Sequence, residues 1–179
     1  MIRARLLTRL ARDDGGLALV EFACVLPVLL LMYLAGVQLT DALSCNRKVT
    51  ITARAVADLT TQNASVTDAQ LQTILNASAK VMAPYSVSNA TVQVSELYTD
   101  ASGNTTVKWS KNNKGGGYSP NSSYTLPSQI KINSSYVIVG QVIYSYKPAV
   151  AYKVVGPLTL ADTIYMNPRV SNSVDYKTS

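Results

Sequence analysis

Residues 15–31 read GGLALVEFACVLPVLLL, and this stretch opens the longest apolar segment of the chain. Between Leu17 and Leu39, Glu21 is the only charged residue. A helix of these 23 residues is about 34 Å long, enough to cross a bilayer core of about 30 Å. The sequence therefore predicts a transmembrane helix over residues 17–39. The carboxylate near its start costs roughly 2.5–3.5 kcal/mol on insertion and needs an explanation.

A short basic leader, residues 1–16, precedes the apolar stretch. It carries four arginines against two aspartates, Arg3, Arg5, Arg9 and Arg12 against Asp13 and Asp14. Basic residues beside a membrane span stay on the cytoplasmic side. We therefore expect a cytoplasmic N-terminus and an exported remainder.

The apolar stretch leaves three kinds of processing to weigh. A cleaved secretory signal could use Ala42-Leu43-Ser44 before Cys45, but its apolar core would be too long and would contain an acid. A lipobox ending at Cys45 fits worse, because Ala42 stands where a branched apolar residue is wanted. Cleavage after Gly16 is the third, since glycine can present its peptide bond closely to an enzyme. It would leave the apolar helix as a new N-terminus at Leu17.

The residues around Gly16 resemble a known recognition site. A glycine, a cut, Glu21 at the fifth new position and Phe22 at the sixth are similar to the site of prepilin peptidases. The wider stretch resembles the N-terminus of TadE/TadG/TadF-type minor pseudopilins of tight-adherence (Tad/Flp) pilus systems, in which a VEFA-x-V-x-P core precedes a Leu-rich helix. Residues 20–27 here read VEFACVLP. The resemblance implies processing by a prepilin peptidase at Gly16, Leu17, Glu21 and Phe22.

Processing at Gly16 would give Glu21 a partner. The new amine on Leu17 is a cation, and Glu21 lies four residues on, one helical turn away. Within one chain the carboxylate is favoured near its own helix N-terminus. Between chains, as the resemblance implies, Glu21 of one subunit would pair with the Leu17 amine of the next. Both pairings are open from the sequence.

Pro27 lies inside the predicted membrane helix. Proline removes one backbone donor and frees a carbonyl one turn earlier, so we expect a kink there. Proline is also simply more common in membrane helices than in soluble ones.

Beyond the span, residues 40–62 are predicted to continue as an amphipathic stalk helix. Its narrow stripe consists of Leu39, Ala42, Asn46, Val49, Ala53, Val56 and Thr60. The stripe is expected to pack on the chain's own head or on neighbouring subunits. Cys24 and Cys45 are about 32 Å apart on one helix, too far for a disulfide, and the role of Cys45 is open.

Residues 63–179 are predicted to form an exported α+β head. Thr67 and Gln70 match a capping box, and the helix that they begin must end before Pro84. Alternating apolar residues then predict strands over 91–98, 105–110, 135–146 and 158–166, with 135–146 central because it is apolar on both faces. The expected architecture is a helix packed on an antiparallel sheet, and the loop 111–123 is either functional or mobile.

The head offers little material for catalysis. The chain contains no His, and its acids are isolated in sequence, so we expect no catalytic dyad, no metal site and no cofactor. The basic residues Lys108, Lys111 and Lys114 lie beside Trp109, but a nucleic-acid site needs a denser cluster. We predict a protein that is neither an enzyme nor a nucleic-acid binder.

The resemblance implies a non-catalytic minor pseudopilin that takes part in assembly of a Tad pilus, a process serving adhesion and biofilm formation. It would be a single-pass protein of the bacterial inner membrane with a periplasmic head, in or at the base of an extracellular pilus. Its partners would be a prepilin peptidase, other pseudopilins, the major pilin and the assembly platform. An uncleaved signal-anchored binding protein and a type II secretion pseudopilin are the alternatives.

Overall fold

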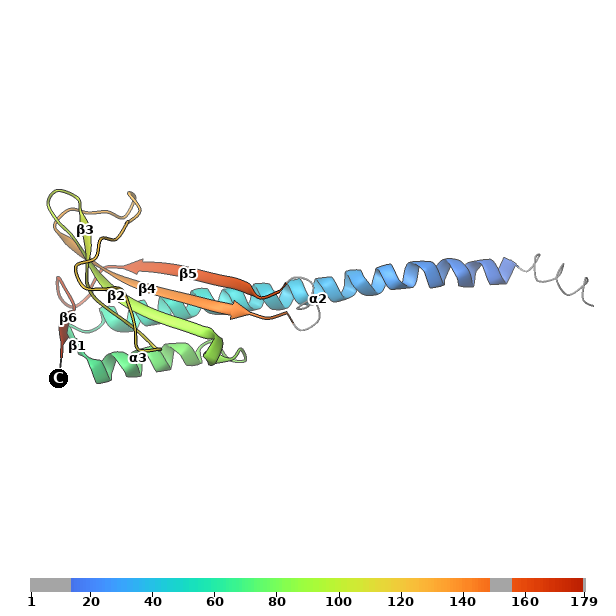
Figure 1. Ribbon diagram of the computed structural model, residues 1–179, viewed down its shortest axis with the longest axis horizontal. Helices are drawn as coiled ribbons and strands as arrows, with labels where there is room; N and C mark the ends of the chain where they lie inside the picture. The colour runs from blue at the N-terminus through green and yellow to red at the C-terminus, as the bar shows by residue number, and fades with distance from the viewer. Residues whose placement is uncertain (1–13, 149–155, 179) are drawn as a thin grey trace, which may run out of the picture. The chain divides into compact units, whose positions relative to one another are not determined.

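The computed structural model describes residues 14–148 and 156–178 (Figure 1). The chain forms two compact units that divide between Asp41 and Ala42. In chain order the elements are α2 (Asp14–Thr61), β1 (Ser65–Thr67), α3 (Asp68–Lys80), the 3₁₀ helix η1 (Val87–Asn89), β2 (Ala90–Thr99), β3 (Thr105–Asn112), β4 (Ser135–Tyr146), β5 (Leu158–Met166) and β6 (Asp175–Lys177). The predicted α+β class is confirmed.

The head contains an antiparallel four-stranded sheet in the order β3-β2-β4-β5. Strands β4 and β5 have the predicted bounds. β2 is longer than predicted by one residue at each end, and β3 by two residues at its end. β4 lies between β2 and β5, so the strand that is apolar on both faces is central, as expected. The sequence did not reveal a second, two-stranded parallel sheet, in which β1 pairs with β6.

The predicted capping box begins α3. Gln70 donates its backbone N–H to the Thr67 hydroxyl at 3.4 Å, and the Thr67 N–H donates to Gln70 Oε1 at 2.9 Å. These two bonds satisfy donors that the first turn of a helix otherwise leaves unpaired. The helix ends at Lys80, before Pro84, and buries Leu71 and Leu75.

Residues 42–61 of α2 belong to the head and, together with α3, cover one face of the sheet. Their fully buried apolar side chains are Cys45, Val49, Ala53, Val56 and Ala57. From Ala42 onward the predicted stripe is packed on the chain's own head, but it was wrong at two positions. Leu39 is 63% exposed, and Asn46 is exposed whereas Cys45 is buried. The two residues are adjacent on the helix: the polar amide of Asn46 stays in solvent, and the small apolar Cys45 side chain points into the core.

Gly140 in β4 is the point where helix and sheet come closest. A Cβ atom at this position would overlap the backbone oxygen of Ala53 and lie 2.9 Å from Ala57 Cβ and 3.0 Å from Val56 Cγ1. Only a residue without a side chain allows this approach. The glycine therefore sets the depth at which α2 packs on the sheet.

The loop that follows β3 covers part of the opposite face. Leu126 packs on Leu97, Val107, Val137 and Val139, and Tyr124 and Ile130 add partly buried contacts. The loop 111–123 was predicted to be functional or mobile. In the structure its chain is tied to β3, because Asn121 N–H donates to the Val107 carbonyl at 2.7 Å.

Candidate functional site

The predicted processing residues lie in the first turns of α2. Gly16, Glu21 and Phe22 are exposed, and no other part of the described chain lies within 4 Å of where a Cβ of Gly16 would be. Positions 17 and 21 are both helical, so they are one turn apart. Of the leader, residues 1–13 lie outside the described residues.

The apolar surface of α2 is continuous from Leu19 onward. Phe22 is 58% exposed, and large apolar residues along residues 19–39 remain exposed in the same way. Among the described residues, one helix is long and apolar enough to cross a membrane, and this is it. A soluble protein rarely exposes such a surface, so lipid or other proteins must cover it.

Pro27 lies inside α2, and the helix is continuous through it from Asp14 to Thr61. The turns on either side of Pro27 therefore stay helical, although proline has no backbone N–H to donate. The kink itself stays a prediction.

A buried carboxyl group lies in the head, where the sequence predicted no site. Glu96 in β2 is only 3% exposed, and its Oε1 accepts a hydrogen bond from the Val174 N–H at 2.6 Å. Trp109 Nε1–H donates to the Val174 carbonyl at 2.8 Å. Burial raises the pKa of Glu96 to about 7, against the opposing effect of its hydrogen bonds. The side chains of Glu96 and Trp109 thus bind the backbone N–H and C=O of Val174, a residue of the C-terminal segment.

The C-terminal segment is fastened at further points. The Arg169 guanidinium forms an ion pair with Asp58 at 2.5 Å, and its backbone N–H donates to the Thr61 carbonyl at 3.1 Å. β6 then runs parallel to β1. No local pattern in the sequence predicts these contacts, because every one of them joins segments far apart in the chain.

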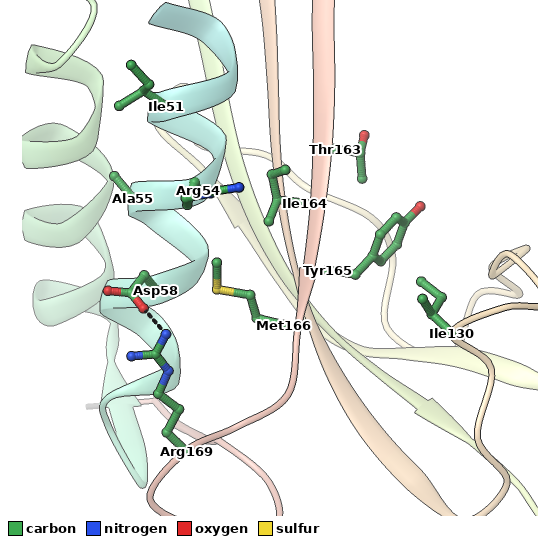
Figure 2. A pocket seen from close by; sticks show the side chains of 10 residues that line it. All are labelled: Ile51, Arg54, Ala55, Asp58, Ile130, Thr163, Ile164, Tyr165, Met166 and Arg169. Carbon is green, nitrogen blue, oxygen red and sulfur yellow. Dashed lines mark ion pairs between the residues drawn. The ribbon is translucent and has the colours of Figure 1, made fainter. Parts of the chain in front are cut away.

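A groove of about 820 Å³ lies between the head part of α2 and β5 (Figure 2). Its lining residues are Ile51, Arg54, Ala55, Asp58, Ile130, Thr163, Ile164, Tyr165, Met166 and Arg169. Figure 2 shows Arg54 reaching from α2 toward Ile164, and Arg169 turned toward Asp58. The groove is mostly apolar and carries more positive than negative charge.

The arrangement of the remaining polar groups bears on chemistry. No group of three His, Cys, Asp or Glu in the described parts of the chain is placed to hold a metal ion. Trp109 is buried in the core, so its ring is not available to stack on a base. The ammonium of Lys111 pairs with Asp68 at 3.1 Å and lies over the ring of Tyr176.

Comparison with known proteins bears on the N-terminal segment. Residues 16–58 match the family model described as TadE-like protein. The match begins at the predicted processing glycine and ends at residue 58, within the head part of α2. No curated protein and no solved structure matches the chain. TadE-like proteins are structural components of Tad pilus systems, and the predicted resemblance is confirmed. Residues 16–58 are therefore similar to TadE-like proteins, and the helix that they cover is a candidate membrane span.

Proposed function

We propose that the protein is a non-catalytic minor pseudopilin that takes part in assembly of a Tad pilus and so serves adhesion and biofilm formation. The observation that carries the proposal is the family match, which starts at Gly16 and spans the apolar helix with its single acid. A prepilin peptidase removes residues 1–16, and the helix that remains keeps the protein in the inner membrane until assembly.

Glu21 acts in assembly through the amine that cleavage creates on Leu17. A carboxylate left alone in a membrane helix is costly, and a nearby cation offsets much of that cost. A buried ion pair adds little net stability, but removal of one partner is strongly unfavourable. Glu21 of one subunit and the Leu17 amine of its neighbour therefore set the axial position of two adjacent helices.

The intact mass of the membrane-extracted protein tests the processing step. In cells that contain a prepilin peptidase we expect the mature chain to begin at Leu17. A chain that begins at Met1 would instead support a signal-anchored protein, and one that begins at Cys45 a secreted protein. Replacing Gly16 with Val should leave the full-length mass, whereas Gly15→Val, the same change one residue earlier, should still allow cleavage. Equal processing of both variants would contradict a site at Gly16.

Replacing Glu21 with Gln tests the pairing step. We expect this variant still to be cleaved, because the cut follows Gly16, but to enter the pilus machinery at a level reduced at least about tenfold. Glu21→Asp keeps the charge and serves as the control. Piliation and co-purification with other pilus subunits are the measurements. Normal incorporation of Glu21→Gln would overturn the pairing while leaving the processing result intact.

A further inference from the structure

The outer edge of β5 is an open side of the four-stranded sheet. β5 pairs with β4, and no other strand in the described parts of the chain pairs with it. Unpaired N–H and C=O groups along an edge strand form a template for another strand. The use of this edge depends on which residues direct these groups outward.

Hydrogen bonds at the far side of the sheet settle that direction. Asn113 donates its N–H to the Val92 carbonyl, and its Oδ1 accepts from the Val92 N–H, both at 3.0 Å, so Val92 faces β3. In an antiparallel sheet, successive residues direct their backbone groups to alternate sides. Val92 lies opposite Val142, which therefore directs its backbone groups away from β2 and toward β5. Asp162 lies opposite Val142 and directs its groups back toward β4, as does Ile164 two residues later. Thr163 and Tyr165 therefore direct their N–H and C=O groups outward.

The two outward residues differ in how they are occupied. The Thr163 N–H donates to Asp162 Oδ1 at 2.8 Å, and the Thr50 hydroxyl holds the other oxygen of that carboxylate. Because the Asp162 carboxylate occupies the Thr163 N–H, it hinders the addition of another strand at the middle of the β5 edge. No described residue takes up the outward N–H and C=O of Tyr165. Of these two residues, Tyr165 is therefore the one whose outward groups are open to a partner strand, and it lines the groove of Figure 2.

The groove adds apolar surface and charge beside these backbone groups. Ile51 belongs to α2, and Ile164 lies on the side of β5 that faces α2, whereas Ile130 lies on the other side of β5, beyond Tyr165. Asp58 neutralises Arg169, whereas the exposed Arg54 forms no ion pair with any described residue. The groove therefore offers apolar contacts, two backbone groups and one uncompensated cation.

We propose that the β5 edge binds an extended acidic segment of a partner protein as an added strand. Its backbone pairs with Tyr165, alternate apolar side chains enter the groove, and a carboxylate meets Arg54. A helix would satisfy its own backbone and leave Tyr165 unpaired. A second copy joined edge to edge would bring the two Arg54 side chains toward each other, and like charges across such a junction are unfavourable.

A blocked, fluorescently labelled peptide of about seven residues, alternating Val and Thr with one central Glu, is a suitable probe. Its anisotropy is measured with the full chain in detergent micelles. We expect saturable binding, at least about tenfold weaker for the same peptide with N-methyl groups on alternate amides, because the strand hydrogen bonds are lost. A Lys in place of the Glu should weaken binding about threefold or more.

Arg54→Glu tests the charge, with Lys114→Glu as the matched control, since Lys114 is exposed in the turn after β3 at the other edge of the sheet. Arg54→Glu should reverse the preference between the Glu and Lys peptides, and Lys114→Glu should not. Hydrogen exchange should show the peptide protecting the outward amide of Tyr165.

Several results would overturn the proposal. They are equal binding of the methylated peptide, no binding up to about 1 mM peptide, and protection of amides away from β5. A dimer of the chain that protects the Tyr165 amide would assign the edge to a second copy instead. The test does not depend on processing at Gly16, so it and the proposed pilus function fail independently.

Discussion

Replacing Gly140 with Ala should lower the unfolding free energy of the head by about 3 kcal/mol, the upper part of the range for overpacked cores. The added methyl would overlap the backbone oxygen of Ala53 and crowd Ala57 Cβ at 2.9 Å. Backbone cannot turn aside as a flexible side chain can, so α2 must move away from the sheet. Gly140→Val should prevent stable folding, since small domains are stable by only about 5–15 kcal/mol.

Trp109 provides the measurement for the Gly140 variants. It is the only Trp of the chain and is buried in the head, so its fluorescence during urea unfolding in detergent reports on this unit. Gly116→Ala is the control, because a methyl there meets only the Asn112 side chain, at 3.4 Å. The double variant Gly140→Ala/Ala57→Gly should not recover, since the clash with the Ala53 oxygen remains. A loss below about 0.5 kcal/mol, the range of neutral surface changes, would contradict the close packing.

The stability of the head should fall as the pH rises from about 4.5 to about 7. Glu96 has an ordinary pKa of 4.5 in the unfolded chain and a pKa raised by burial to about 7 in the folded one. Below pH 4.5 both states hold the proton and the full stability is present. Between these values only the folded state holds it, so stability is progressively lost, and above pH 7 a buried charge remains. One pKa unit corresponds to about 1.4 kcal/mol, so the total loss is roughly 3 kcal/mol.

Glu96→Gln should remove this slope. The amide oxygen can still accept the Val174 N–H, but it carries no charge at any pH, so the unfolding free energy should be flat from pH 4.5 to 8. The chain has no His, so no imidazole titrates in this window. Asp100→Asn is the control: hydrogen bonds from Asn104 lower the pKa of Asp100 below its ordinary 3.8, so the stability it provides is lost only at lower pH. A slope that persists in Glu96→Gln would assign the effect elsewhere.

Local patterns in the sequence were enough for several parts of the fold. The capping box needs only Thr67 and Gln70, three residues apart, and the structure has both of its bonds. β4 and β5 have the predicted bounds because alternation of apolar side chains and the flanking turns are local signals. The predicted processing motif and the apolar helix are also contiguous, which is why consecutive residues alone carry the TadE-like resemblance.

The buried carboxyl and the tail contacts were not predictable in the same way. Glu96 reads as one polar residue in an alternating strand, and its partner Val174 is 78 residues away. β1 and β6 have three residues each, too few for a periodic signal. Cys45 and Asn46 differ by one step around a helix, so only the position of the sheet decides which of them is buried.

Near neighbours along the chain are sufficient to specify the long apolar helix with its acid, the predicted cleavage motif, the capped helix and the strands. Other features exist only because distant segments meet in the folded head. The position of the sheet decides which face of α2 is buried and requires a glycine where Ala53 approaches β4. The C-terminal segment buries Glu96, and the Tyr165 end of β5 stays open beside Arg54. The physical reason is that helix capping and side-chain periodicity act over a few residues, whereas close packing and desolvation act between whatever surfaces the fold brings together.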